Sequence, residues 1–524
     1  KTMEYIVPIC VYFIYFFVKS SKTLQYLQQN RYNRGNKYIK YINSHLKHTF
    51  LNAEILFIPL FIILYYIDSD IIYGFACIYA LLLGIKVYTL RVEQKKLPLK
   101  YTFRIIRLYI TLILIYSSIM ILGYYFIDND LILGFILWLF MYLDHYVVIL
   151  ANIINIPAEK LVGLYYKSKA LKKLKSMSNM KVIGITGSYG KTSSKNILSD
   201  ILNIKYNAMP TPKNFNTPYG LMMTINNNNL DKFNDYFIAE MGAFCMGEIK
   251  ELCDLVHPTY GILTKIGVAH LESFGSQENI QKGKFELIES LPSDGIGVLN
   301  FDDPLQVSYK LKNNCKIVTI GIDNKDVDFR ATNIKLSSNG TSFDLIIKGD
   351  KKKYKFETKL LGKANVYNIL AAIALGYNLG INIDQLIIGV KKVKAVEHRL
   401  ELKKMGNINI IDDAYNANPD GTKMALDVLY SMPGKKIVIS SGMIELGDKE
   451  YELNKELGKY MKDCDLVILL GKDLTKPIYD GLMEVKYDKK KIHMLKDINE
   501  AINLINKEKD AYVLIQSDLP DIFN

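Results

Sequence analysis

Hydrophobic positions follow two different patterns along the chain, and the change falls near residue 180. Before it, apolar residues form long, nearly uncharged runs, four of which approach or reach the roughly 20 residues that a helix needs to cross a bilayer. The first run is shorter, but the chain begins with Lys1 rather than Met, so we expect its start to be incomplete. The five runs are Tyr5–Val18, Leu51–Ile67, Ile71–Leu90, Leu108–Ile127 and Leu131–Pro157.

The segments that connect these runs alternate in charge. Residues 19–50, 91–107 and 158–181 carry seven, six and seven Lys or Arg, whereas the two intervening loops contain pairs of Asp. Because basic loops remain in the cytoplasm, five crossings would place the N-terminus outside and everything after about Lys160 inside. Buried core helices of a soluble protein are the alternative, but they leave the alternation unexplained. A secretory signal fits the first run less well, because further apolar runs follow and no small-residue cleavage site is present.

From Met180 onward, short strand-like runs alternate with helical stretches, which is typical of a doubly wound α/β domain. Residues 326–360 instead alternate strand-like segments with turn signals and predict a small antiparallel excursion. Helical stretches are predicted at 191–203, 247–254 and 278–290. Buried parallel strands are predicted at Lys181–Thr186, Tyr236–Glu240, Tyr260–Thr264, Ile296–Asn300, Ile408–Asp412, Lys436–Ser440 and Asp465–Leu470.

The predicted fold class is therefore α/β, preceded by a transmembrane region. We expect about five transmembrane helices over residues 1–175, a P-loop-type doubly wound central domain over 176–395, and a smaller α/β C-terminal domain over 396–524. Both α/β domains would lie in the cytoplasm, tethered to the cytoplasmic membrane.

The net positive charge of the chain is concentrated in its N-terminal third, which also contains the long apolar runs. The net charge is +13, and the residues up to Lys181 hold 22 Lys and Arg against nine Asp and Glu, so the rest is close to neutral. A nucleic-acid-binding domain would need a basic soluble patch, and we expect no nucleic-acid partner. The six cysteines include no Cys-x-x-Cys pair, which argues against a structural zinc site and fits a reducing cytoplasm.

A glycine-rich loop between a predicted strand and a predicted helix carries the strongest chemical signal. Glycines let backbone N–H groups surround phosphate oxygens, and the following helix N-terminus favours the same anion. Lys191 would then contact the β- and γ-phosphates, and the Thr192 hydroxyl would hold Mg²⁺. The strict G-x-x-x-x-G-K-[ST] spacing places Ile185 where its first glycine belongs, and an ordinary glycine-rich turn is the alternative. The predicted phosphate contacts are Gly187, Ser188, Tyr189, Gly190, Lys191, Thr192 and Ser193.

This loop and the segments after it resemble the Mur ligase family, ATP-dependent ligases that add amino acids to the cell-wall muropeptide. The resemblance covers about residues 180–524 and follows the family's order. Its AHLE and DDAYNANP segments most resemble the branch that attaches D-alanyl-D-alanine. The matching segments are TPKNFNTPYG at 211–220, EMGA at 240–243, GEI at 247–249, TKIGVAHLE at 264–272, KFEL at 284–287, GKANV at 362–366, EHRLE at 397–401, DDAYNANP at 412–419 and GMIELG at 442–447.

The resemblance implies that ATP activates a carboxylate as an acyl phosphate. Metal ions and cations must screen the repulsion between the two anions that meet. Two Mg²⁺ ions are implied, with Thr192, Glu240, His270 and Lys284 as ligands, and Lys191, His270 and Lys284 as catalytic residues. The matching lysine of the family is carbamylated by CO₂, which turns an ammonium into a carboxylate-like ligand and requires a depressed pKa. Without the resemblance, Glu240 is a structural acid, His270 a packing residue and Lys284 part of a charged helix face.

Other family positions imply contacts with the nucleotide and the substrates. Asn365, Arg399 and Asp413 would contact the adenine, phosphate and ribose of ATP, in an interdomain cleft that closes on the nucleotide. Substrate contacts are implied for Asn216, Thr217, Asn416 and Asn418, the last two facing the incoming dipeptide.

Two departures from the family bear on the substrate. Soluble members begin with a small domain that holds the uridine diphosphate of the substrate, and here the apolar third stands in its place. The chain also ends QSDLPD at 516–521, where the branch has K-G-S-R. We therefore expect a muropeptide partner that is nucleotide-linked or lipid-linked, together with D-alanyl-D-alanine or a similar acceptor. A lipid-linked form would suit a tethered enzyme, because tethering raises its effective concentration toward a membrane-bound partner.

The predicted function is an ATP-dependent peptide ligase of cell-wall precursor synthesis, with ATP and Mg²⁺ as cofactors. A transport ATPase is an alternative, but only Asp144 and His145 lie in the middle of an apolar run, and DDAYNANP has no role in it. A membrane-anchored nucleotide-binding scaffold leaves the intact Lys191, Glu240 and Lys284 unexplained. The related amidating enzyme carries a cysteine-rich zinc insert, which the cysteine spacing argues against.

Overall fold

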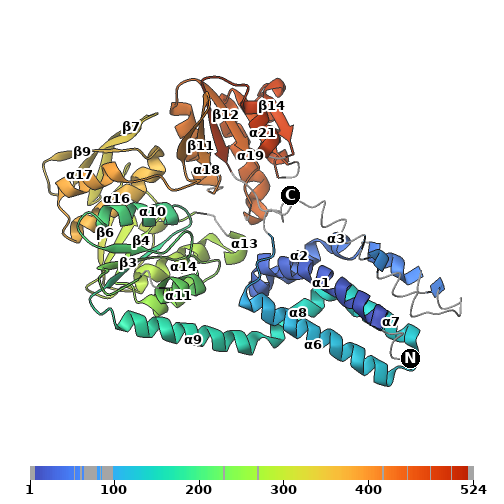
Figure 1. The fold of residues 1–524 in the computed structure, drawn as a ribbon. Helices are drawn as coiled ribbons and strands as arrows, with labels where there is room; N and C mark the ends of the chain where they lie inside the picture. The colour runs from blue at the N-terminus through green and yellow to red at the C-terminus, as the bar shows by residue number, and fades with distance from the viewer. Residues whose placement is uncertain are drawn as a thin grey trace. The chain divides into compact units, whose positions relative to one another are not determined.

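The computed structural model divides the chain into two compact units (Figure 1). The first consists mainly of the residues up to Leu164, and the second runs from Tyr165 to Leu519. The structure describes residues 6–51, 53–59, 62–63, 80–82, 84, 98–227, 230–267, 271–415, 418–444, 446–471, 474–496 and 498–516.

Helices make up the described part of the first unit, and α9 (Ile156–Lys175) leads from it into the second. The described residues of the first predicted run lie within α1, and all but the last residue of the fourth lie within α6, whereas the fifth is broken between α7 and α8 by a bend of 73°. Part of the second run and most of the third lie outside the described residues. The helix bounds are α1 Ile6–Gln29, α2 Lys37–Ser44, α3 Leu46–Phe50, α6 Phe103–Phe126, α7 Asp130–Tyr142 and α8 Asp144–Ile154, with 3₁₀ turns at Arg31–Asn36 and Ala53–Leu56.

Among the described residues, α6 is the one helix that is long and apolar enough to cross a membrane. The bent pair α7–α8 would add a second crossing if it forms a single span. This is fewer than the five crossings that the sequence predicts; of the predicted runs, 71–90 lies mostly and 51–67 partly where the structure gives no description.

A buried polar cluster joins α1, α6 and α8. Asp144, at the start of α8, is fully buried and accepts hydrogen bonds from Thr23 Oγ1 at 2.5 Å and Tyr116 Oη at 2.7 Å. Beside it, His145 Nδ1 lies 2.7 Å from Tyr38 Oη. A carboxylate in apolar surroundings needs such donors, because burying an unpaired charge is costly. The polar residues that interrupt the fifth apolar run therefore hold helices together.

A nine-stranded sheet forms the centre of the second unit, in the order β2-β3-β1-β4-β5-β6-β7-β8-β9. The strands from β2 to β7 pair in parallel, and β7, β8 and β9 form the predicted antiparallel excursion. The strand bounds are β1 Lys181–Thr186, β2 Ala208–Pro210, β3 Tyr236–Glu240, β4 Tyr260–Leu263, β5 Ile296–Asn300, β6 Lys316–Gly321, β7 Phe329–Ser337, β8 Gly340–Ile347 and β9 Lys353–Thr358.

Helices cover both faces of this sheet, as Figure 1 shows. Successive residues of a strand point to opposite faces, so Ile183 and Ile185 of β1 pack with α10, α16 and α17, while Val182 packs with α11, α12 and α14. The bounds are α10 Lys191–Leu202, α11 Pro218–Asn226, α12 Glu248–Val256, α13 Leu271–Phe274, α14 Gln277–Glu289, α15 Pro304–Val307, α16 Gly362–Asn378 and α17 Ile383–Lys392. Because the strand order reverses direction at β1, ligands are expected at the carboxyl end of this strand.

A second, six-stranded sheet follows, in the order β10-β11-β15-β12-β13-β14. All its pairs are parallel except β10–β11. α18, α19 and α20 pack on one face and α21 on the other. The bounds are β10 Glu401–Met405, β11 Ile408–Asp413, β12 Lys435–Ser440, β13 Leu466–Leu470, β14 Ile492–Leu495, β15 Ala511–Gln516, α18 Pro419–Ser431, α19 Glu450–Tyr460, α20 Lys476–Glu484 and α21 Ile498–Ile505.

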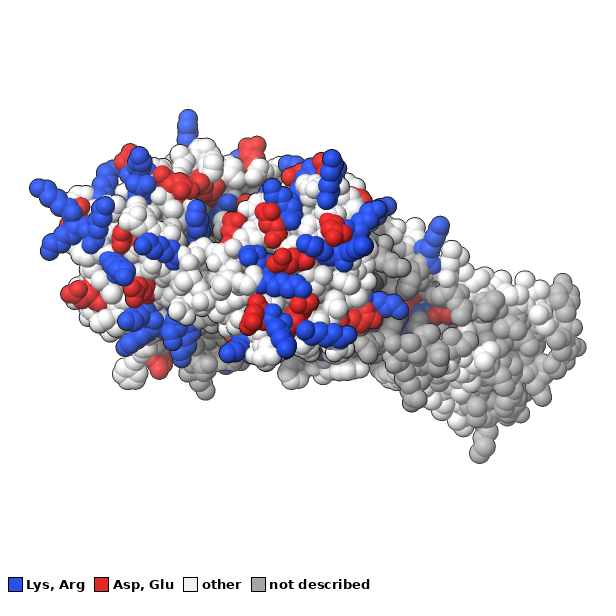
Figure 2. Space-filling model, turned by 90° about the horizontal axis from the view of Figure 1, so that it is seen from above, with Lys and Arg blue, Asp and Glu red and all other residues white. Residues whose placement is uncertain are grey.

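The α/β fold predicted from the sequence is confirmed, and the predicted strands form within one residue of their expected bounds. Basic and acidic side chains are interspersed on the face of the second unit seen in Figure 2. A single-signed basic patch of the kind that nucleic acids require is not seen on this face.

Candidate active site

The glycine-rich loop joins the carboxyl end of β1 to the N-terminus of α10. Gly187 has a φ of 146°, and a Cβ there would lie 1.9 Å from Thr264 Oγ1, so a side chain does not fit. Gly190 precedes α10 with a φ of 80°, in the left-handed region that glycine adopts without strain. The backbone thus forms a tight turn at a helix N-terminus, the geometry that binds anions.

Neighbouring strand ends hold this loop in place. Thr264, directly after β4, donates from Oγ1 to the Tyr189 carbonyl at 2.5 Å, and Ser188 N donates to the Lys265 carbonyl at 2.9 Å. Lys191 Nζ folds back onto the loop and donates to the carbonyls of Gly187 at 2.8 Å and Ser188 at 3.1 Å. Burial lowers the pKa of Lys191 to about 8; Glu240 opposes this lowering and Arg399 adds to it.

A buried carboxylate lies next to the loop, at the end of β3. Glu240 is 1% exposed, and its Oε1 accepts hydrogen bonds from Thr192 Oγ1 and Asn216 Nδ2, each at 3.1 Å. Its Oε2 lies 3.1 Å from Lys195 Nζ. The predicted Mg²⁺ ligands Thr192 and Glu240 are therefore in direct contact, and Asn216 from the predicted substrate loop joins them.

Lys284 lies on α14 and is buried. Its Nζ donates to the Ala243 carbonyl at 3.3 Å and lies 5.4 Å from the centre of the Phe274 ring. Burial, followed by repulsion from Lys191, lowers the pKa of the Lys284 amino group well below its ordinary value, although Glu248 and Glu286 act in the opposite direction. A neutral amine is the form that reacts with CO₂, so this environment suits the carbamylation that the family resemblance implies.

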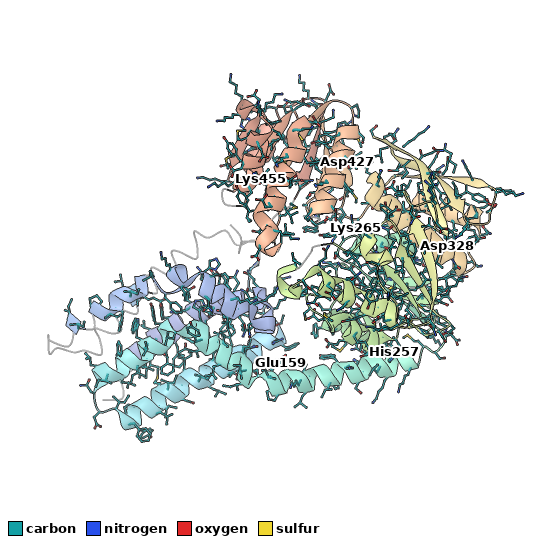
Figure 3. The ribbon with its side chains drawn as sticks, turned by 180° about the vertical axis from the view of Figure 1, so that it is seen from behind. Glu159, His257, Lys265, Asp328, Asp427 and Lys455 are labelled. Carbon is teal, nitrogen blue, oxygen red and sulfur yellow. The ribbon has the colours of Figure 1, made fainter. Side chains whose placement is uncertain are left out.

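An open pocket lies between the two sheets of the second unit. Predicted nucleotide contacts from both sides line it together: Tyr189, Gly190, Ser193, Asn365, Arg399 and Asp413. Lys265 and Asp420, from opposite sides, also line the pocket and form an ion pair at 3.2 Å; Lys265 is labelled in Figure 3.

Arg399 is presented to this pocket by a strained turn. The residues on either side of it, His398 and Leu400, have φ values of 59° and 49°, which non-glycine residues rarely adopt. Asp413 Oδ1 accepts from Leu400 N at 3.0 Å, and Asp412 Oδ2 contacts His398 Nδ1 at 2.7 Å. The paired acids at the end of β11 therefore fix the backbone that carries Arg399.

Several predicted site residues lie outside this pocket, or have side chains that cap a helix. Lys284, Glu240 and Asn216 do not line this pocket. Thr217 and Asn418 cap α11 and α18, accepting from Gly220 N at 3.2 Å and Gly421 N at 2.7 Å. Contacts of these two residues with a substrate stay predictions. His270 and Asn416 lie outside the described residues.

Three residues that the geometry places at the site have no role predicted from the sequence. Lys195 pairs with Glu240, Thr264 anchors the loop, and Asn368 lies beside Gly190, within 3.0 Å of a Cβ built there. Lys195 follows Lys191 by four residues, and this spacing puts both on one face of a helix. This spacing could therefore have indicated Lys195. Thr264 lies in a segment that matches the family and Asn368 on a helix, but their uncharged side chains give no comparable indication.

The described residues offer donors for Mg²⁺ but no preformed cage of protein ligands. Among the described residues, no group of three or more His, Cys, Asp and Glu could hold a metal ion. A buried carboxylate beside a threonine hydroxyl is nevertheless a donor set that Mg²⁺ uses when substrate phosphates supply further oxygens.

The depressed pKa of Lys191 predicts a pH dependence of nucleotide binding. Below pH 8 the side chain is charged and attracts phosphate; above it, binding must recharge the amine, so metal-free ADP affinity falls by up to about tenfold per pH unit. Calorimetric titration of the full chain between pH 7 and 9 measures this slope. In the Lys191→Arg variant the guanidinium stays charged, and the slope should flatten; equal slopes in both proteins would contradict the assignment.

Known proteins are similar to this chain over both of its α/β domains. The model of the Mur ligase middle domain matches residues 185–376, and that of the Mur ligase, glutamate ligase domain matches 398–518. The UDP-N-acetylmuramoyl-tripeptide--D-alanyl-D-alanine ligase of Bacillus subtilis is 36% identical over 298 residues, 56% of this chain and 63% of the relative. The ligase of the same name from Buchnera aphidicola subsp. Baizongia pistaciae is 30% identical over 340 residues, 64% of this chain and 71% of the relative.

A solved structure of a Mur ligase is also similar to this chain. The MurF ligase of Thermotoga maritima in complex with ADP superposes with a TM-score of 0.60 and 27% identity, covering 67% of this chain and 80% of that one. The chain spans slightly less than two thirds of the length of the Bacillus subtilis relative. From the matched domains and the extent of the Buchnera match, the chain belongs to the Mur ligase family.

Proposed function

We propose that this protein is an ATP-dependent ligase that joins the carboxylate of a muropeptide to the amine of D-alanyl-D-alanine or a similar acceptor. The observation that carries the proposal is the contact of Thr192, Glu240 and Asn216 beside the phosphate loop, which brings nucleotide-side and substrate-side residues to one point. The relatives are named for this reaction, which favours a ligase over a transport ATPase or a nucleotide-binding scaffold.

The proposed reaction has two steps. An oxygen of the muropeptide carboxylate attacks the γ-phosphorus of ATP, the bond from that phosphorus to the bridging oxygen breaks, and ADP leaves. The amine nitrogen of the acceptor then attacks the acyl carbon, the carbon–oxygen bond to phosphate breaks, and the amine gives up a proton to solvent. The first step brings two anions together, and the second brings a polar amine to the acyl phosphate. The main tasks of the protein are therefore to position the reactants and to compensate their charge.

Residues of the chain would divide these tasks. The loop amides and the Lys191 ammonium would bind the nucleotide phosphates, and Arg399, which lines the pocket, would add positive charge. Thr192 and Glu240 would hold Mg²⁺, which supplies charge screening between phosphate and carboxylate. Carbamylated Lys284 and His270 would contribute to a second ion.

The pocket between the two sheets supports closure on the nucleotide. Asn365 and Asp413 line it from opposite sides, and the Lys265–Asp420 ion pair spans it. Closing such a cleft excludes water from an acyl phosphate, which water would otherwise hydrolyse.

We further infer that the first unit anchors the protein in the cytoplasmic membrane, with the catalytic domains in the cytoplasm. α6 is 24 residues long and apolar. Exposed aromatic side chains lie at both of its ends, Tyr101 and Phe103 at one and Tyr124, Tyr125 and Phe126 at the other. Aromatic belts of this kind are typical of helices that meet both membrane–water interfaces. The charge alternation of the connecting segments supports the same topology.

A membrane anchor favours a lipid-linked muropeptide as the substrate. The matched family domains begin only at residue 185, after the helical unit. Confinement to the membrane that carries the substrate raises its effective concentration without new contacts.

Mass analysis of the product tests the proposed reaction. The full chain, given ATP, Mg²⁺, a tripeptide muropeptide and D-alanyl-D-alanine, should form the pentapeptide product and one ADP for each bond made. Lys191→Ala should abolish turnover, because the phosphates lose their main charged contact. Lys181→Ala serves as the control, since Lys181 is exposed at the far end of β1. ATP hydrolysis that does not depend on the acceptor would refute the ligase.

The carbamate role of Lys284 predicts chemical rescue. Lys284→Ala should lose at least about 100-fold in kcat, in line with the removal of a metal-ligand contact, and short carboxylic acids such as formate or acetate should restore part of it. Lys282→Ala is the matched control, because Lys282 lies on the same helix and is exposed in an ion pair with Glu278. Full activity of Lys284→Ala, or no response to carboxylic acids, would contradict the role.

Two muropeptides that differ only in their carrier test the substrate class. In lipid nanodiscs the full chain should show a kcat/KM at least about tenfold higher for the lipid-linked tripeptide than for the nucleotide-linked one, from effective concentration alone. A preference for the nucleotide form would remove the lipid proposal and leave the ligase itself standing.

A further inference from the structure

Lys195 is a buried cation that the proposed chemistry does not use. It lies on α10, one turn after Lys191, and is 1% exposed. Its Nζ pairs with Glu240 Oε2 at 3.1 Å and donates a hydrogen bond to the carbonyl of Lys213. A buried ammonium costs free energy unless it has such partners, and here both partners belong to the site.

The Lys213 carbonyl belongs to the loop of residues 211–217, between β2 and α11. Lys213 has a φ of 47°, a strained value that persists only where neighbouring contacts enforce it. The same loop contributes Asn216, whose Nδ2 binds Glu240 Oε1 and whose carbonyl accepts from Gly242 N at 2.8 Å. Gly242 has no room for a side chain, since a Cβ would lie 2.8 Å from Asn216 Cγ.

The two carboxylate oxygens of Glu240 therefore have different partners. Oε2 is held by Lys195, while Oε1 faces Thr192 and Asn216. Without Lys195, Oε2 would lose its cation partner and only the donors on Oε1 would orient the carboxylate, while the 211–217 loop would lose the donor to its Lys213 carbonyl.

We propose that Lys195 is a positioning residue that sets the orientation of the Glu240 carboxylate and holds the 211–217 loop against the phosphate-binding helix. It acts through Glu240 and the loop and touches no substrate itself. The proposal rests on the proposed function in one respect, namely that Glu240 and the loop serve the nucleotide and the muropeptide.

Hydrogen exchange tests the loop without any turnover. In Lys195→Met the amides of residues 211 and 213–217 should exchange at least about fivefold faster than in the parent, because a local opening becomes easier. Lys181→Met is the control, since that lysine is exposed at the start of β1, and should leave exchange of the loop unchanged. Unchanged loop exchange in Lys195→Met would overturn the proposal even if the protein is an active ligase.

Binding and kinetics test the orientation of Glu240. Metal-free ADP should bind Lys195→Met and the parent within about threefold of each other, whereas the gain in ADP affinity on adding Mg²⁺ should fall at least about tenfold. The KM for the muropeptide should rise in the same variant. Lys195→Arg keeps a charged donor and should recover part of both effects; a Mg²⁺ gain equal to that of the parent in Lys195→Met would overturn the orientation role.

A second pair of variants keeps the test decisive if Lys195→Met does not fold. Lys195→Met combined with Glu240→Gln removes both buried charges and restores neutrality. Its loop amides should still exchange faster than those of Glu240→Gln alone, because the Lys213 carbonyl has lost its donor. Equal exchange in these two proteins would overturn the proposal.

Discussion

Glu240 is a carboxylate with almost no exposure to water, and every neighbouring group at the site has to balance or share its charge. Thr192 and Asn216 donate to one of its oxygens, and Lys195 pairs with the other. The sheet order makes this convergence possible, because β3 lies directly beside β1 and their carboxyl ends meet. The phosphate loop, the metal ligands and the substrate-side loop are thus built around one buried negative charge.

Much of the fold follows from local patterns in the sequence. The short β-branched runs that become β1, β3, β4 and β5 are bounded by turn residues, so their positions were predictable within one residue. The sequence patterns did not predict β15 and α16, for a different reason in each case. β15 is a single apolar run with no helix after it in the described chain, and α16 is buried on nearly all sides, so it lacks the polar face that reveals a surface helix.

Site residues were predictable from the sequence where the residue type and its position indicate a single chemical role. Lys191 and Thr192 follow a glycine-rich turn, and the structure places them beside the predicted Glu240. Residues with several uses were harder to interpret. Asn418 and Thr217 have side chains that also cap helices, and Lys195 resembles any surface lysine until the fold buries it. The membrane region shows the same limit, since charge alternation predicts five crossings while the described residues contain one or two candidate spans.

The ion pair between Lys265 and Asp420 has a consequence for how the enzyme could release its product. Both side chains are more than one third exposed, at 37% and 41%, so water and dissolved salt weaken their attraction to no more than about 1 kcal/mol. A contact this weak guides the lobes toward each other yet breaks readily under thermal motion. Raising the ionic strength would weaken this contact further, so it contributes little to holding the lobes together.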